Sequence, residues 1–166
     1  AALMLPVIVT TIPIFILVRQ FQLLNTYNGN AAPTLLMTPF AVFFLRQFFL
    51  GVNREVEEAA RIDGASIWVS FVRVVVPMTI PALTTLAIVT LIGTWNNYLW
   101  PLIVGSDESV RVLTVALGIF RTQTPQGSPD WTGLMAGTTL AIIPTFIIFM
   151  LLGRRILDSI QFTGFK

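Results

Sequence analysis

The chain has 166 residues, of which 55% are hydrophobic and 11% are charged, with a mean hydropathy of +0.81 and a formal net charge of +2. Soluble domains carry about 25% charged residues, so this composition excludes an ordinary soluble domain and indicates a polytopic membrane protein. The small net charge argues against nucleic acid as a partner, and the absence of cysteine and histidine excludes disulfides, thiol catalysis and the commonest metal ligands, so we expect no metal site.

Four apolar stretches along the chain are predicted to cross the membrane. A spanning helix needs about 20 apolar residues. The predicted spans, in chain order, cover residues 3–18, 34–50, 79–104 and 131–152. The apolar stretch from Val110 to Phe120 is too short to cross and predicts an interfacial or re-entrant segment. The sequence begins with Ala inside an apolar run, without the charged n-region of a signal peptide, and we expect a piece of a longer protein.

The distribution of Lys and Arg predicts which side of the membrane each loop faces. With loops on alternate sides, the loop at 53–77 and the C-terminal tail share a side, which holds seven Lys or Arg residues against three on the other. The seven are Arg46, Arg54, Arg61, Arg73, Arg154, Arg155 and Lys166, and the three are Arg19, Arg111 and Arg121. Because short cytoplasmic loops are enriched in Lys and Arg, we expect this loop and the C-terminus in the cytoplasm.

The loop between the second and third predicted spans is patterned as a helix–turn–helix. In its first helix Val56, Ala59 and Ala60 recur at helical spacing, and acidic residues gather at the start, where they suit the helix dipole. Gly64 permits a turn that a Cβ would oppose, and Ser66 is a candidate N-cap for a second helix. The pattern alone fits either a docking element or an amphipathic loop that rests on lipid headgroups.

The second helix of this loop is predicted to have two distinct faces. If its period is 3.6 residues, one face is apolar and the other is polar. The apolar face comprises Ile67, Phe71, Val74 and Val75, and the polar stripe comprises Ser66, Ser70 and Arg73.

The same loop carries the motif of a known family. Glu58-Ala59-Ala60 is followed after three residues by Gly64, and after nine more by Val74-x-Val76-Pro77. This sequence resembles the EAA loop of ABC importer permeases, whose pattern has Ile and Leu at the two valine positions. The resemblance implies a coupling helix that inserts into a groove on a cytoplasmic ATPase subunit. Its contact residues would be Glu58, Ala59, Ala60, Arg61, Asp63 and Gly64.

Further stretches resemble the carbohydrate branch of this family, and specifically the second permease subunit of maltose-type importers. They are "LLNTYNG" (23–29), "FLRQFFL" (44–50), "EAARIDGAS" (58–66) and "TWNNYLWPLIV" (94–104). Because that family has six spans, the resemblance implies an all-α, MetI-like transmembrane helix bundle. The chain would be its C-terminal portion, with four of six spans present.

The resemblance also implies the partners and the location of the protein. A second permease subunit would pair with this one, two ABC ATPase subunits would bind ATP and Mg²⁺, and an extracytoplasmic substrate-binding protein would deliver a sugar. The chain itself would be a transport subunit rather than an enzyme, without a cofactor, in the plasma (inner) membrane of a bacterium or archaeon. It has no Walker motif, so we expect a partner to supply ATP hydrolysis.

Polar residues inside the third and fourth spans are candidates for a substrate path. Trp95, Asn96, Asn97 and Thr138 offer the aromatic faces, amides and hydroxyl that a neutral sugar needs. The alternative is that the aromatic residues belong to an interfacial belt, the amides join helices, and the threonine bonds its own helix.

Two other functions are also compatible with the sequence. The first is an ABC importer permease for amino acids, phosphate or a metal chelate, although no span interior carries the cation that an anionic substrate favours. The second is a membrane-embedded enzyme or a channel. All eight acidic residues lie in loops or the tail, which argues against an enzyme with paired carboxylates at membrane depth.

Overall fold

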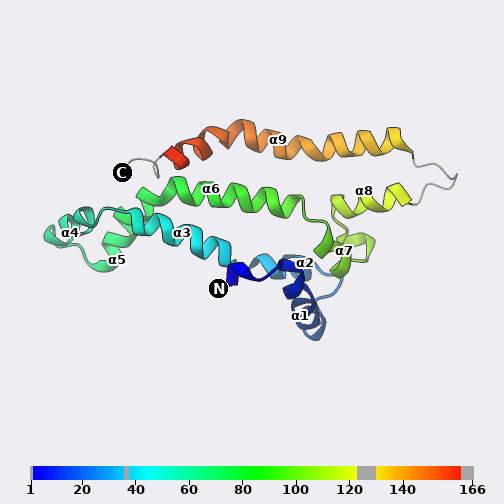
Figure 1. The fold of residues 1–166 in the computed structure, drawn as a ribbon, viewed down its shortest axis with the longest axis horizontal. Helices are drawn as coiled ribbons and strands as arrows, with labels where there is room; N and C mark the ends of the chain where they lie inside the picture. Colours follow the sequence, from blue (N-terminus) through cyan, green and yellow to red (C-terminus); the bar gives the residue numbers. More distant parts are fainter. Residues whose placement is uncertain (1, 36–37, 123–129, 162–166) are drawn as a thin grey trace. The chain divides into compact units, whose positions relative to one another are not determined.

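The computed structural model describes residues 2–35, 38–122 and 130–161 (Figure 1). These residues form helices and no strands, so the predicted all-α fold is confirmed. The α-helices are α1 (Val7–Gln20), α2 (Tyr27–Leu35), α3 (Pro39–Gly51), α4 (Arg54–Ile62), α5 (Ile67–Ser70), α6 (Val76–Trp95), α7 (Leu99–Val104), α8 (Leu113–Thr122) and α9 (Trp131–Gln161). Two 3₁₀ turns (Ala2–Met4 and Glu108–Val110) and one π-helical turn (Phe71–Val75) complete the elements.

The helices group into two compact units. The first comprises residues 1–38 and 92–147, and the second comprises residues 39–91 and 148–166. The long helices α6 and α9 each contribute residues to both.

Two continuous helices are long and apolar enough to cross a membrane. They run from Ile67 to Trp95 and from Trp131 to Gly153, and each contains an 18-residue stretch with a mean hydropathy of 2.1. At 1.5 Å per residue the first, with 29 residues, is about 43 Å long and exceeds the roughly 30 Å hydrocarbon core. The threonines inside it bond carbonyls of their own helix, because lipid offers no other partner: Thr79 donates to Val76, and Thr84 to Ile80.

The first of these helices differs from the predicted span at 79–104. It begins earlier, at Ile67, because α5, the π-helical turn and α6 follow one another without a break. It ends at Trp95, where the Asn96 side chain donates to the Ile92 carbonyl and closes the last turn. Residues 99–104 form the separate helix α7.

The remaining apolar helices are short. α1 has 14 residues, α3 has 13 and α8 has 10, so none reaches the length of a spanning helix by itself. α3 approaches that length only together with α2, across residues 36 and 37, which lie outside the described part. The limits of the spans predicted at 3–18 and 34–50 therefore stay predictions.

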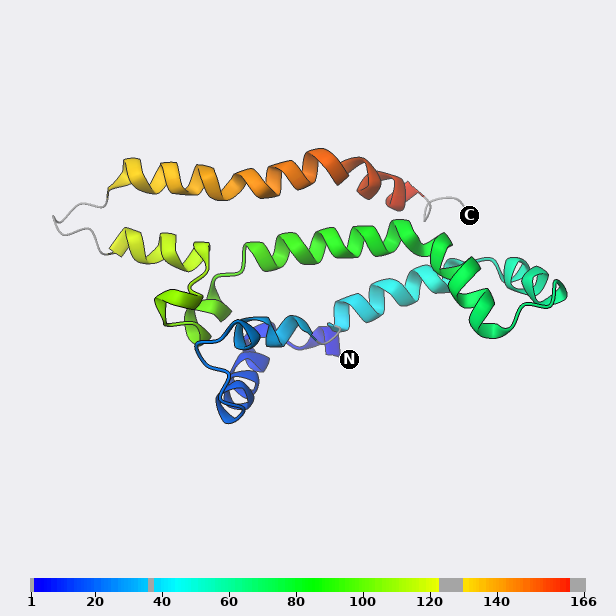
Figure 2. The same ribbon diagram turned by 180° about the vertical axis from the view of Figure 1, so that it is seen from behind.

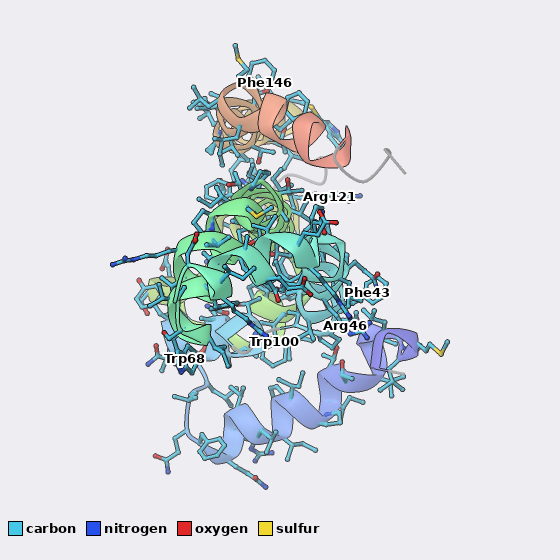
Figure 3. The ribbon with its side chains drawn as sticks, turned by 90° about the vertical axis from the view of Figure 1, so that its left-hand side faces the viewer. Phe43, Arg46, Trp68, Trp100, Arg121 and Phe146 are labelled. Atoms are coloured by element: carbon cyan, nitrogen blue, oxygen red, sulfur yellow. The ribbon has the colours of Figure 1, made fainter. Side chains whose placement is uncertain are left out.

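The first unit is centred on a hydrophobic cluster around Trp100. Val18 of α1 packs against Trp100 and Val104 of α7, and all three side chains are buried. The half-buried residues around them are Ile14, Phe15, Leu23, Leu24 and Ala32. Elsewhere apolar side chains face outward, as Phe146 of α9 shows in Figure 3. Such exposure suits helices whose surroundings are lipid or other helices.

The second unit carries the predicted hairpin. α4 and α5 extend beyond the ends of α3 and the start of α6, as Figure 2 shows. Phe49 of α3 contacts Phe71 of the π-helical turn, with ring centroids 6.2 Å apart. Along α3, Phe44 contacts both Phe40 and Phe48, at 5.7 and 4.9 Å. This aromatic row fixes the helix from which the hairpin departs.

Candidate functional site

The first helix of the hairpin is fixed at its start by side-chain hydrogen bonds. Asn53 is the N-cap of α4: its Oδ1 accepts from the backbone N–H of Glu55 at 3.1 Å, and its Nδ2 donates to the Glu55 carboxylate at 3.1 Å. Glu55 and Glu57 lie in the first turn, and Arg61 lies in the last. Charges of these signs at these ends stabilise a short helix through its dipole.

The turn between the two helices is a Schellman motif. The Gly64 N–H donates to the Arg61 carbonyl at 3.0 Å, and the Ala65 N–H donates to the Ala60 carbonyl at 2.9 Å. Gly64 has φ +84°, and no atom lies within 4 Å of the position a Cβ would occupy. Glycine is therefore required by backbone conformation and not by space. Ser66 then begins α5, with its hydroxyl accepting from the Val69 N–H at 3.4 Å.

The predicted contact residues of the hairpin lie on its outer surface. Glu58, Ala59, Arg61, Asp63 and Gly64 are exposed, and Ala60 is half-buried. No side chain of α4 is buried, and the last residue of the helix, Ile62, is 86% exposed. The exposed surface of α4 therefore consists of small and charged residues and ends in the isoleucine.

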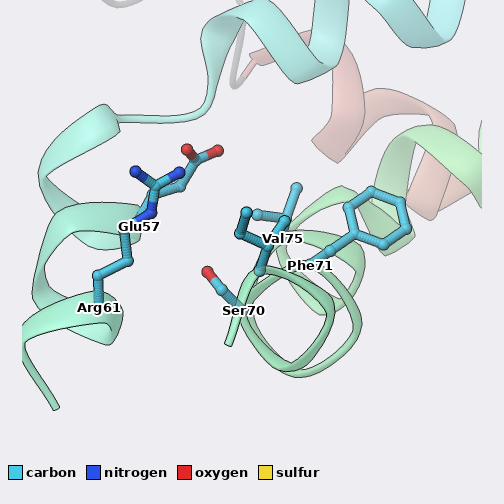
Figure 4. Close-up of a pocket in the computed structure, with 6 residues that line it drawn as sticks. Glu57, Arg61, Ser70, Phe71 and Val75 are labelled. Atoms are coloured by element: carbon cyan, nitrogen blue, oxygen red, sulfur yellow. The ribbon is translucent and has the colours of Figure 1, made fainter. Parts of the chain in front are cut away.

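A small cavity lies on the inner side of the hairpin, between α4 and the π-helical turn (Figure 4). Its volume is about 110 Å³, and its lining residues are Glu57, Arg61, Ile67, Ser70, Phe71 and Val75. The sequence pattern does not indicate this cavity, and the predicted position of Ser70 opposite Phe71 and Val75 is wrong, because all three residues line the same space.

The residues of the "TWNNYLW" stretch act as ties between helices of the first unit. Trp95 Nε1 donates to the Ala141 carbonyl of α9 at 3.1 Å, and Trp100 Nε1 donates to the Gly29 carbonyl of α2 at 3.1 Å. The Asn97 carbonyl accepts from the Thr114 hydroxyl of α8 at 2.7 Å. Each tie joins the end of α6 or the start of α7 to a different helix.

Most of the predicted substrate-path residues are engaged in local or interhelical hydrogen bonds. The Asn96 side chain caps its own helix, and the Thr138 hydroxyl donates to the carbonyls of Leu134 and Met135, each at 3.0 Å. Among the residues that the structure describes, the Asn97 side chain has no hydrogen-bond partner. Whether any of these residues lines a substrate path stays a prediction. Of the two asparagines, Asn97 is the one whose side-chain amide makes no hydrogen bond to the described residues.

Two of the carbohydrate-like stretches are brought together in the first unit. Asn25, with φ 55°, accepts at its Oδ1 from the backbone N–H groups of Ser106 and Asp107, at 2.7 and 3.1 Å. The Tyr27 hydroxyl donates to the Ser109 carbonyl at 2.9 Å. A Cβ on Gly29 would collide with the Leu23 carbonyl oxygen. The segment after α1 is therefore clamped onto the segment after α7.

Residues 1–161 match the family described as binding-protein-dependent transport system inner membrane components. The chain belongs to this family. The match covers both the hairpin and the clamped segments of the first unit, so the family assignment predicted from the EAA motif is confirmed.

The relatives of this transport system component are permease proteins of several uptake systems. The chain is 35% identical to the arabinooligosaccharides transport system permease protein of Halalkalibacterium halodurans, over 99% of the chain and 57% of the relative. It is 32% identical to the diacetylchitobiose uptake system permease protein of Streptomyces coelicolor, over 100% and 55%. It is 37% identical to the sn-glycerol-3-phosphate transport system permease protein of Yersinia pestis, over 92% and 53%. The chain spans about half the length of the curated relatives it matches.

Proposed function

We propose that this chain is part of the permease subunit of an ABC sugar importer, and that the hairpin of α4 and α5 couples it to ATPase subunits. The single observation that carries the coupling role is the geometry of the EAA motif. Its glycine takes the positive φ of a Schellman turn, and its Glu58 and Ala59 are exposed on a capped helix. A rigid, outward-facing helix of this kind suits transmission of motion between subunits.

The partners follow from the same proposal. A sister permease completes the translocation path, and two ATPase subunits bind ATP and Mg²⁺ on the cytoplasmic side. An extracytoplasmic binding protein delivers the sugar. ATP binding closes the ATPases, the coupling helices move together, and the permease pair turns outward to receive the sugar. The hairpin and the C-terminus face the cytoplasm, in agreement with the excess of Lys and Arg on their side.

A second candidate substrate is a sugar-related phosphate ester. The glycerol-3-phosphate relative favours it, whereas the two oligosaccharide relatives favour a neutral sugar. An anionic substrate would need a cation at membrane depth. The helix Trp131–Gly153 contains no Lys or Arg, and the helix Ile67–Trp95 contains only Arg73, in its second turn. We therefore favour a neutral oligosaccharide. Uptake of a labelled oligosaccharide panel and of labelled glycerol-3-phosphate by the reconstituted complex separates the two.

The coupling role is tested by charge reversal at Glu58. The full-length permease carrying Glu58→Lys is expressed with its sister permease and ATPase, and the complex is purified in detergent. We expect the ATPase to be lost or its ATP hydrolysis to become independent of the binding protein, while membrane insertion is unchanged. Glu108→Lys is the matched control, because Glu108 is also an exposed acidic residue but lies in the other unit. Equal ATPase recovery and equal uptake for both variants would show that the hairpin does not couple.

A further inference from the structure

The long helix that begins at Ile67 carries a tryptophan near each end. Trp68 is 77% exposed and Trp95 is 41% exposed. Because both belong to one continuous helix, a rise of 1.5 Å per residue separates their Cα atoms by about 40 Å. A bilayer with its headgroup regions is about 40–45 Å thick, and tryptophan is enriched at both of its interfaces. The length of the helix therefore matches a position of Trp68 and Trp95 in the headgroup regions of opposite leaflets.

Arg73 lies at the edge of the hydrocarbon core in this arrangement. Because the core is about 30 Å thick, it begins about 5 Å along the helix from each tryptophan. Arg73 comes five residues after Trp68, which is about 7–8 Å along the axis. Helical side chains lean toward the N-terminus of their helix, and here that end carries Trp68. The side chain of Arg73 therefore leads its guanidinium out of the hydrocarbon and toward the headgroups.

The surface between Trp68 and Arg73 is exposed and mostly apolar. Val69 precedes Arg73 by four residues and Val72 follows Trp68 by four, so each valine shares a helix face with one of them. Val69 is 39% exposed, Val72 is 58% exposed, and Arg73 is exposed as well. Arg73 has no ion pair or hydrogen bond with any residue that the structure describes. An indole, two valines and an unpaired guanidinium thus form one patch, which we call the Trp68–Arg73 patch.

We propose that the Trp68–Arg73 patch binds one anionic phospholipid of the cytoplasmic leaflet. The guanidinium of Arg73 bonds the lipid phosphate in a bidentate manner. The indole of Trp68 lies among the headgroups, and the two valines contact the start of the acyl chains. The single positive charge favours an anionic lipid, which the cytoplasmic leaflet provides. The inference rests on the proposed function only for the side of the membrane that the hairpin faces.

The position of the patch gives the lipid a role in coupling. The patch lies on the first turns of the helix, and Phe71 and Val75 of the same turns line a cavity together with Glu57 and Arg61 of α4. A phospholipid held by Arg73 therefore fixes the height of the coupling helix relative to the headgroup layer.

Trp68 itself reports which lipid lies beside it. The full-length permease, purified with its sister permease and ATPase, is reconstituted in phosphatidylcholine bilayers that contain phosphatidylglycerol. One lipid at a time carries brominated acyl chains, which quench tryptophan fluorescence on contact, and the Trp68 signal is the difference between the unchanged complex and Trp68→Phe. At equal mole fraction we expect phosphatidylglycerol to bind beside Trp68 about fivefold more strongly than phosphatidylcholine. Arg73→Gln and high salt are expected to remove this preference, whereas Arg73→Lys, which keeps the charge, retains most of it.

Arg46→Gln is the matched control. Phe49 of α3 contacts Phe71 with ring centroids 6.2 Å apart, and Arg46 precedes Phe49 by three residues, about 4–5 Å along α3. Arg46 is therefore an exposed arginine at a depth close to that of Arg73. Figure 3, viewed from the hairpin end, shows Arg46 and Trp68 on opposite sides of the second unit. We expect Arg46→Gln to leave the lipid preference at Trp68 unchanged.

Three results would overturn the inference. If the two lipids quench Trp68 equally and Arg73→Gln changes nothing, Trp68 touches the bilayer without a headgroup site. If Arg46→Gln removes the preference as fully as Arg73→Gln, the preference comes from the general surface charge. If neither lipid quenches Trp68 and Trp68→Phe lowers ATPase recovery, the patch contacts protein. The coupling role is judged separately, because loss of the ATPase in Glu58→Lys tests that role whichever lipid lies beside Trp68.

Discussion

Trp95→Phe removes one hydrogen bond between α6 and α9 and keeps the aromatic ring. The bond joins Trp95 Nε1 to the Ala141 carbonyl at 3.1 Å, close to Pro144, which leaves the Leu140 carbonyl without its helical donor. Trp95 therefore bonds the same turn of α9 that lacks the backbone hydrogen bond from residue 144 to Leu140. An interhelical hydrogen bond in a membrane protein contributes about 0.6 kcal/mol on average and at most ~1.7 kcal/mol. Trp95 is 41% exposed, so we expect a loss of about 1 kcal/mol for Trp95→Phe.

The free energy of unfolding of the full-length permease is measured in mixed micelles by titration with denaturant. Trp131→Phe is the matched control, because Trp131 begins the same helix α9, is 53% exposed and has no hydrogen-bond partner among the described residues. If both variants lose the same free energy to within about 0.3 kcal/mol, the usual error of additivity, the bond to Ala141 contributes nothing and the interpretation of Trp95 as a tie is wrong.

Two glycine substitutions test the turn and the clamp. Gly64→Ala places a Cβ at φ +84° and is expected to lower the free energy of unfolding by about 1–2 kcal/mol and to reduce recovery of the ATPase with the permease. Gly51→Ala is the control, because no atom lies within 4 Å of its Cβ, and it is expected to leave stability and ATPase recovery unchanged. Equal recovery for the two variants would contradict the Schellman turn. Gly29→Ala drives a Cβ into the Leu23 carbonyl oxygen and is expected to lower the midpoint of thermal unfolding and to expose the segment after α1 to protease. Gly93→Ala, which meets nothing within 4 Å, is its control, and identical protease patterns would argue against the clamp.

The hairpin was predictable because its signals are local. Gly64 and Ser66 each act within four residues, through the Schellman turn and the N-cap that the structure contains. Glu58, which the resemblance to the EAA loop assigns to the contact surface, is exposed on the same short helix. Family membership was predictable for a related reason, since the EAA motif is a continuous stretch of sequence.

Other features depended on information that a local pattern does not contain. Trp95 reaches a carbonyl 46 residues away and Trp100 one 71 residues away, and no spacing rule identifies such an acceptor. The face of Ser70 is a different case: it was predicted to lie opposite Phe71 and Val75, but residues three and four apart share a helix face, so Ser70 stands beside Ile67 and Val74 even at a 3.6-residue period. Ser70 therefore lines a cavity together with Phe71 and Val75, instead of standing opposite them.

The clamp of the first unit has a consequence for how the protein is made. The indole of Trp100 and the carbonyl of Gly29 lie 71 residues apart in the chain. At roughly 5–20 residues per second, the ribosome completes Trp100 about 4–14 s after Gly29. During that interval the segment after α1 has none of its partners from α7 or the segment that follows. Its backbone, with Gln22 and Asn25 at positive φ, therefore gains its tertiary hydrogen bonds only after α7 has been synthesised, several seconds after α1 itself.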